Sequence, residues 1–108
     1  MELDIQAIHT EAKTASITAE ADYIAKYGEQ AYCGFGWVEV YVERTNSKLA
    51  KALIAVGFSK SYKAKCLTLW TTGTYHGQSM DVKEAGSDAY AKVLKTHGLR
   101  AYACSRAD

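Results

Sequence analysis

Hydrophobic positions recur at helical spacing in three segments of the chain. Ile5, Ile8 and Ala12 begin one such stripe, and a shifted stripe continues it to Ile24. Because glycine readily adopts the left-handed conformation that ends many helices, a glycine after each stripe marks its end. Helices are therefore expected over residues 3–27, 46–56 and from Asp81 onward, ending at Gly28, Gly57 and Gly98.

Alternating positions predict three strands, over residues 32–42, 65–71 and 99–104. The first of them is the most regular. Its valines fall on one side, and four other large side chains fall on the opposite side. The valine side consists of Val38, Val40 and Val42, and the other side of Phe35, Trp37, Glu39 and Tyr41.

Polar residues in front of two helices suggest how those helices begin. Thr45 or Asn46 can cap the middle helix, because a short oxygen-bearing side chain accepts a hydrogen bond from the first turn. Asp81, followed three residues later by Glu84, predicts a capping box for the last helix.

The order of elements is α-β-α-β-α-β, which predicts an α+β fold with a sheet of about three strands packed against helices. One domain over residues 1–108 is expected, because 108 residues are too few for two good cores. Within it, residues 1–28 form an N-terminal helix and residues 31–108 an α/β core.

If the valine side of the first strand faces the helices, Phe35, Trp37 and Tyr41 lie on an open face of the sheet. A large exposed aromatic patch is unusual in a monomer. Three explanations stay open: the N-terminal helix crosses over to cover this face, a second subunit packs on it, or it is a platform for a ligand.

Composition excludes some classes of protein. The charges nearly balance, with 13 Lys and Arg against 12 Asp and Glu, so net charge does not favour nucleic acid or acidic membrane as a partner. The chain has no apolar run near 20 residues and no signal-peptide pattern, which predicts a cytoplasmic protein without membrane association. Cys33, Cys66 and Cys104 form no CxxC pair and are expected to be buried thiols.

Two loops carry candidate binding chemistry. Residues 43–48, ERTNSK, run from a strand into a helix start, where free amides and cations can bind an anion, although an ordinary capped helix explains them too. The Gly-rich spacing of a P-loop is absent. Residues 73–81, GTYHGQSMD, lead into the last helix. If the first two strands are parallel, both loops lie at the same edge of the sheet, where ligands of α/β sheets often bind.

These features suggest a site for a nucleotide or another anionic small molecule, in which a ring stacks on the base while amides and cations meet the phosphate. Trp70 fits a buried core position equally well. Arg100 also lies near the expected rim. The candidate ligand-binding residues are Trp37, Tyr41, Arg44, Thr45, Asn46, Ser47, Trp70, Tyr75, His76, Gln78, Ser79 and Arg106.

The sequence gives little support for catalysis. The cysteines lie in expected strands and His76 in a loop, so no Cys–His pair is indicated. His9 and His97 lie on helices, away from any cluster at metal-ligand spacing. We therefore expect no catalytic residue, no metal and no cofactor.

Residues 33–48, CGFGWVEVYVERTNSK, and residues 77–108, which begin GQSMDVKEAG and end CSRAD, resemble a group of small bacteriophage and prophage accessory proteins of largely uncharacterised function. The shared pattern is Cys-Gly-aromatic-x-Trp-Val, a Thr-Asn-Ser-Lys helix start, Gln-Ser-Met, and a terminal Ser-Arg-x-Asp. It covers roughly residues 31–108.

The resemblance implies a binding protein acting in the cytoplasm of a host cell. A homo-oligomer that sequesters a nucleotide-like host signal, and so evades host defence, combines this context with the aromatic and anion-binding features. The alternatives are an inhibitor that binds a host protein through its aromatic face, and, third, a nucleic-acid-binding module or small hydrolase.

Overall fold

The computed structural model describes residues 3–29 and 33–107, and this part of the chain confirms the expected α+β fold. A fourth, two-residue strand lies in the polar connector before the second expected strand. The elements are α1 (Ile5–Tyr27), β1 (Gly34–Tyr41), α2 (Lys48–Ala55), β2 (Ser59–Lys60), β3 (Cys66–Leu69), α3 (Met80–Thr96) and β4 (Arg100–Ala107).

The sheet has the strand order β2-β3-β1-β4, and every neighbouring pair is antiparallel. From β1 onward the chain follows the β-α-β-β-α-β order of the split βαβ arrangement. The assumption that the first two long strands are parallel is therefore wrong. Because β2 intervenes and pairs with β3, the chain reverses before β3 enters the sheet beside β1. The loops that follow β1 and β3 consequently lie at opposite ends of the sheet.

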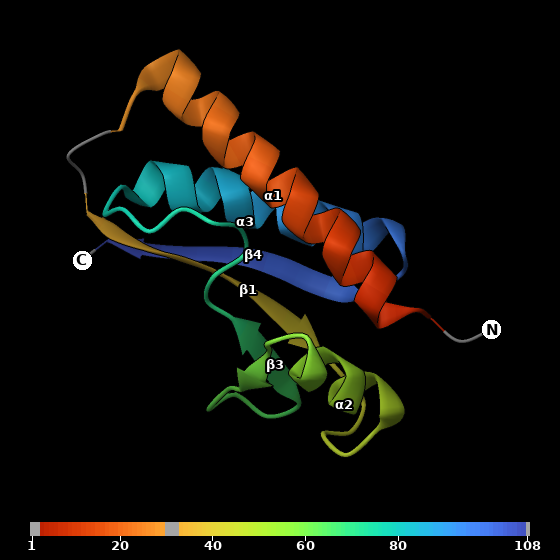
Figure 1. Cartoon of the computed structure of the whole chain (residues 1–108). Coiled ribbons are helices and arrows are strands. Elements are labelled where there is room, and N and C mark those ends of the chain that lie inside the picture. Colours follow the sequence, from red (N-terminus) through yellow and green to blue (C-terminus); the bar gives the residue numbers. More distant parts are fainter. Residues whose placement is uncertain (1–2, 30–32, 108) are drawn as a thin grey trace.

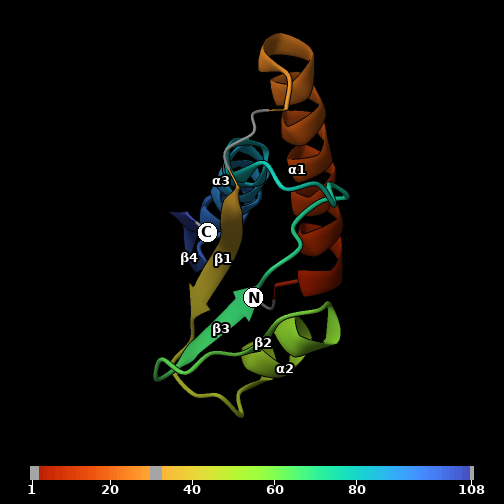
Figure 2. The ribbon, with the colours of Figure 1, turned by 90° about the vertical axis from the view of Figure 1, so that its left-hand side faces the viewer.

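The helices of the described chain all lie on one side of the sheet (Figures 1 and 2). Val38 and Val40 have no exposed surface and point into this layer, which confirms the valine side as core. Leu53 of α2 and Leu94 of α3 join the same apolar cluster. The alternation of strand side chains then places Phe35, Trp37, Glu39 and Tyr41 on the opposite side.

Helix α1 does not cross to that opposite side. It packs along α3, as both views of the ribbon show. Small residues allow the close approach: Ala12 and Ser16 are fully buried, and a Cβ atom at Gly86 would lie only 2.9 Å from the Ser16 hydroxyl. Of the three explanations for the aromatic face, a covering by the N-terminal helix is therefore excluded.

The helix caps differ from those expected, whereas the glycine stops are confirmed. Ser47 caps α2 and Ser79 caps α3, each accepting a hydrogen bond from a backbone N–H three residues on. Thr45 and Asn46 lie before the cap of α2. Asp81 is in the first turn of α3, so the expected capping box is wrong. Positive φ angles occur at the expected stops, Gly28, Gly57 and Gly98.

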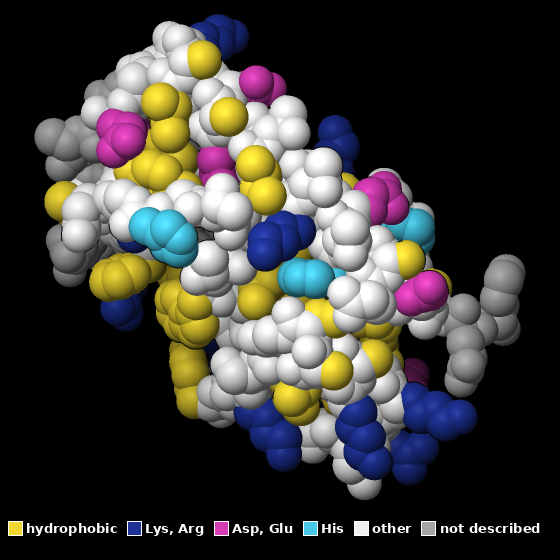
Figure 3. Space-filling model, in the orientation of Figure 1, with side chains coloured by type: hydrophobic (Ala, Val, Ile, Leu, Met, Phe, Trp, Pro, Cys, Tyr) yellow, Lys and Arg dark blue, Asp and Glu magenta, His cyan; other side chains and the backbone are white. Residues whose placement is uncertain are grey.

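The ERTNSK segment joins β1 to α2, and Lys and Arg side chains gather around α2 at the lower end of the molecule in Figure 3. This end lies away from residues 70–79, which run along the α1–α3 side (Figure 2). None of the described helices is long and apolar enough to cross a membrane.

Candidate functional site: an aromatic sheet face and an adjoining cleft

The open side of the sheet is a mixed aromatic and cationic surface, which we call the aromatic face. Strand alternation and the register between strands define its members. Among the described residues no helix covers it (Figure 2). It contains Phe35, Trp37, Glu39 and Tyr41 from β1, Cys66 and Thr68 from β3, Trp70 just beyond β3, and Arg100, Tyr102, Cys104 and Arg106 from β4.

Trp37 and Trp70 form the centre of this face. Their ring centroids are 4.8 Å apart and the rings are tilted by 35°. Trp37 is half-buried, whereas 56% of Trp70 is exposed. The alternative that places Trp70 in the core is therefore wrong: its indole lies at the surface and presents an aromatic ring to solvent.

Glu39 is buried beneath the aromatic rings. Its carboxylate accepts hydrogen bonds from the Trp37 indole at 3.2 Å, from the Tyr41 hydroxyl at 3.2 Å, and from the Lys63 ammonium at 3.0 and 3.1 Å. Burial works to raise the pKa of Glu39, but these donors outweigh it and hold the pKa below its ordinary value. Glu39 therefore carries its charge at neutral pH and fixes the orientation of Trp37.

Cations border the aromatic rings along the face. The Arg106 guanidinium lies 5.9 Å from the Phe35 ring centre, and Arg100 lies 6.0 Å from that of Tyr41. Among the residues that the structure describes, Glu39 is the one acid that strand alternation places on this face, and Lys63 neutralises it. The face is thus locally positive although the chain as a whole is nearly neutral.

A cleft opens beside this face because the sheet is split next to β1. Leu69 pairs with Val38, but the chain leaves the ladder at Trp70. The chain returns to β1 farther along the strand. There the Gly34 N–H donates to the Gln78 carbonyl at 3.3 Å, and Cys33 and Ser79 form an isolated antiparallel β-bridge. Between these two points lies a cleft of about 200 Å³.

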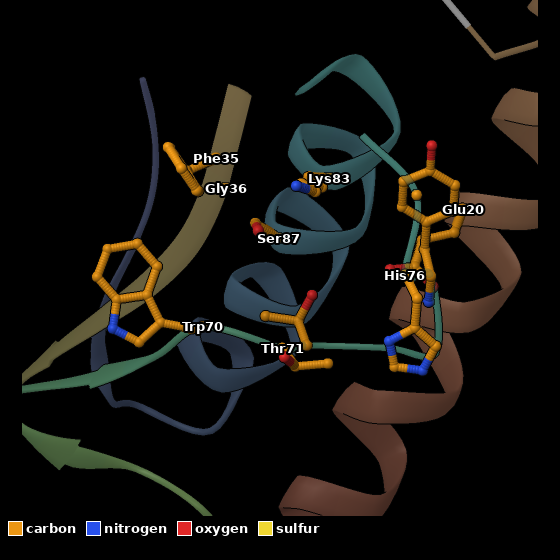
Figure 4. Close-up of a pocket in the computed structure, with 11 residues that line it drawn as sticks. Glu20, Phe35, Gly36, Trp70, Thr71, His76, Lys83 and Ser87 are labelled. Carbon is orange, nitrogen blue, oxygen red and sulfur yellow. The ribbon is translucent and has the colours of Figure 1, made fainter. Parts of the chain in front are cut away.

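Side chains from both sides of the sheet line this cleft, as Figure 4 shows. Phe35 and Trp70 stand on the side of the aromatic face. Lys83 and Ser87 reach it from α3, and Glu20 from α1. The Lys83 ammonium donates to the Gly34 carbonyl at 2.9 Å and lies 5.4 Å from the Phe35 ring centre. The cleft therefore combines aromatic walls with a cation.

Glu20 holds the loop that frames the cleft. One carboxylate oxygen accepts the backbone N–H groups of Thr74 and Tyr75, at 3.1 and 3.3 Å. Gly73 leaves room for this contact, since a Cβ atom there would overlap the carboxylate. Burial raises the pKa of Glu20, and the two N–H donors offset this only in part.

Tyr75 has a structural task in the same loop. Its hydroxyl accepts the Ser79 N–H at 3.1 Å and donates to Glu29 at 3.0 Å. It also packs against Gly77, where a Cβ atom would collide with the hydroxyl. Tyr75 thus braces the loop, while its side chain contributes to the cleft lining.

The structure brings together part of the expected site and separates the loop that follows β1 from it. Trp37, Trp70 and Arg106 share the aromatic face, and Tyr75 and His76 line the cleft. Tyr41 lies farther along β1 on the same face. Ser79 is occupied as a helix cap, and the Gln78 backbone closes the cleft. Arg44, Thr45, Asn46 and Ser47 follow the far end of β1, so the predicted anion site does not adjoin the aromatic rings.

Several residues of the site were missed by sequence reasoning. Lys63 lies in the polar connector, where nothing in the pattern points to Glu39. Gly36, Lys83 and Glu20 reach the cleft from separate elements. The one available signal was Gly36 itself, a glycine inside a strand, which often marks a close approach of another backbone.

The groups of the described residues that bear on reactivity are the cysteine thiols and any cluster of metal ligands. Burial raises the pKa of the Cys66 and Cys104 thiols, which disfavours the reactive thiolate. The expectation of three buried thiols is confirmed for Cys66, holds only in part for the half-buried Cys104, and is wrong for the exposed Cys33. Within residues 3–29 and 33–107, no group of three His, Cys, Asp or Glu side chains is placed to hold a metal ion.

Comparison with known protein families, curated proteins and solved structures found no match to this chain. The resemblance to phage accessory proteins stays a prediction, and the geometry of the site is what supports a function.

Proposed function

We propose that this chain is a non-enzymatic binding protein for a nucleotide-like ligand, whose base stacks on the aromatic face while its anionic part meets the bordering cations. The observation that carries the proposal is the exposed Trp70 ring, which packs against Trp37 at a tilt and lines a cleft that also contains Lys83. Exposed aromatic rings beside cations suit a ligand with one flat apolar part and one negative part.

The sizes of the hollows favour a ligand that lies partly on the face. A cleft of about 200 Å³ is smaller than the roughly 300–1,000 Å³ usual for a whole drug-sized ligand. A second hollow of about 280 Å³ lies across Trp70 from the cleft, and Lys60, Lys63 and Arg106 line it. One ring can enter the cleft while a phosphate lies near these cations.

Sequestration of a host signal is the biological role expected from the resemblance to phage accessory proteins. Such a role needs tight binding and no turnover. Two observations support the lack of turnover. Burial raises the pKa of the Cys66 and Cys104 thiols, and Glu39 is paired with Lys63, so these groups are unsuited to attack a ligand.

Single-stranded nucleic acid is the second candidate, favoured by the length of the aromatic face. Tyr41 and Tyr102 pack edge to face at 5.8 Å, well beyond the Trp37–Trp70 pair. The eight residues of β1 span roughly 25 Å, which gives room for more than one stacked base. An oligonucleotide that binds far more tightly than its mononucleotides, with strong salt dependence, would support this candidate instead.

Thermal unfolding in the presence of a panel of linear and cyclic nucleotides tests the proposal. A ligand at about 100 times its dissociation constant adds roughly 2.7 kcal/mol to the free energy of unfolding. We expect Trp70→Ala to abolish the shift. Ile54→Ala provides the matched control, because Ile54 is also exposed (40%) but lies on α2.

The outcome that contradicts the proposal is equally clear. A panel without any shift, or a shift that Trp70→Ala leaves unchanged, argues against nucleotide binding at this face. Recovery of the nucleotide in altered form after incubation would instead identify an enzyme.

A further inference from the structure

The split in the sheet exposes one backbone position of β1 to the cleft. In the register between β1 and β3, Val38 faces Leu69 and Val40 faces Leu67, so the residue due to face Gly36 is Thr71. Thr71 is no longer in the strand, and both Gly36 and Thr71 line the cleft.

The alternation of an antiparallel ladder shows where the Gly36 backbone points. The Val42 N–H donates to Lys65, and the Gly34 N–H to Gln78, both on the β3 side of β1. The pairing of β1 with β4 runs without a bulge from Gly34 to Tyr41. Gly36 therefore directs both its N–H and its C=O toward the β3 side, into the cleft.

Within residues 3–29 and 33–107 no backbone or side-chain group forms a hydrogen bond with this pair on the cleft side. Gly36 is nevertheless buried, and buried backbone groups are nearly always hydrogen-bonded. Position 36 also has no room for a side chain, since a Cβ atom there would lie 2.9 Å from the backbone of Lys83. The N–H and C=O thus form a donor–acceptor pair between the aromatic walls of Phe35 and Trp70.

We propose that this pair recognises the Watson–Crick edge of a nucleobase, which occupies the ladder position that Thr71 vacates. The inference rests on the proposed function and specifies it. A base carries a donor beside an acceptor on that edge, the combination that a strand residue offers its ladder partner. The cleft then accepts free or single-stranded bases and excludes paired ones, because pairing uses the same edge.

The test compares 5′-monophosphates with analogues in which methyl groups block the donor–acceptor pair on this edge. The pairs are uridine with 3-methyluridine, guanosine with 1-methylguanosine, adenosine with N6,N6-dimethyladenosine, and cytidine with N4,N4-dimethylcytidine. Phosphate and ribose are unchanged within each pair. Because a good two-bond contact to a base edge discriminates by roughly 1–3 kcal/mol, we expect methylation to weaken binding by about fivefold to 150-fold.

The amide of Gly36 supplies an independent readout. In a ¹⁵N–¹H spectrum it should move downfield with the tightest-binding nucleotide, and it should not do so with the methylated analogue. Equal affinities within a pair, together with an unmoved Gly36 amide, would overturn this inference while leaving nucleotide binding intact. If none of the nucleotides binds, the proposed function fails and this inference fails with it.

Discussion

At the residue scale, Glu39 and Glu20 show how two buried carboxylates acquire opposite behaviour. Glu39 has charged and neutral donors on both oxygens, and its pKa is lowered. Glu20 has two backbone donors on one oxygen, and burial raises its pKa. Burial raises the pKa of a carboxylate and hydrogen-bond donors lower it, so the number and charge of the donors decide the direction of the shift.

Glu39→Gln should destabilise the protein at neutral pH by about 1–3 kcal/mol, because the amide cannot keep the charged bond to Lys63. The folded pKa of Glu39 lies below the ordinary value of about 4.3. Its contribution is therefore complete above that value and is lost as the pH falls through the folded pKa. Urea unfolding of both proteins between pH 3 and 7 measures the difference, which should shrink on the acidic side.

The exposed neighbour Glu43 supplies the control for that experiment. Glu43→Gln should change the free energy of unfolding by less than about 0.5 kcal/mol. A difference between wild type and Glu39→Gln that stays constant across the pH range would contradict the assignment of the lowered pKa to Glu39.

Glu20→Gln is expected to behave in the opposite way. The amide oxygen can still accept the Thr74 and Tyr75 N–H groups, and no charge is buried. Since the folded pKa of Glu20 is raised, wild type gains stability as the pH falls through it, and the variant does not. Chemical denaturation at pH 7 should find Glu20→Gln at least as stable as wild type, and Glu20→Ala about 1–3 kcal/mol less stable. A marked loss in Glu20→Gln would mean that the charge itself is needed.

At the scale of elements, the cap of α2 offers a direct comparison between residues next to one another. Ser47 accepts the Ala50 N–H at 3.2 Å, whereas Asn46 is exposed before the helix. Ser47→Ala should cost about 1 kcal/mol of unfolding free energy, and Asn46→Ala less than about 0.5 kcal/mol. Thermal unfolding of the two variants measures this, and the reverse order would move the cap to Asn46.

That comparison also shows what the sequence can and cannot predict about elements. The valine alternation and the three glycine stops are local features, and they were predicted correctly. The N-cap of α2 was predicted one or two residues too early, because Thr45, Asn46 and Ser47 are all good capping residues and composition does not choose among them. The antiparallel direction of β3 depends on the short strand β2, whose polar sequence, Ser59–Lys60, carries no strand signal.

At the scale of the whole molecule, the candidate site depends on contacts between distant parts of the chain. The aromatic side of β1 was predictable from alternation alone. The cleft was not, because it arises where residues 70–79 leave the ladder and are held by Glu20 of α1. Lys63 likewise meets Glu39 only through the folded sheet. Single-sequence periodicity contains no information on such long-range contacts.

The two tryptophans of the chain, Trp37 and Trp70, both lie in the proposed site, so intrinsic fluorescence reports on it without any label. The most direct test of nucleotide binding is therefore a fluorescence titration with mononucleotides at fixed salt concentration. A base stacked on these rings should quench the emission in a saturable, one-to-one curve, which Trp70→Ala abolishes and Ile54→Ala preserves. Quenching that rises linearly without saturation, and equally for every nucleotide, would contradict the proposed function.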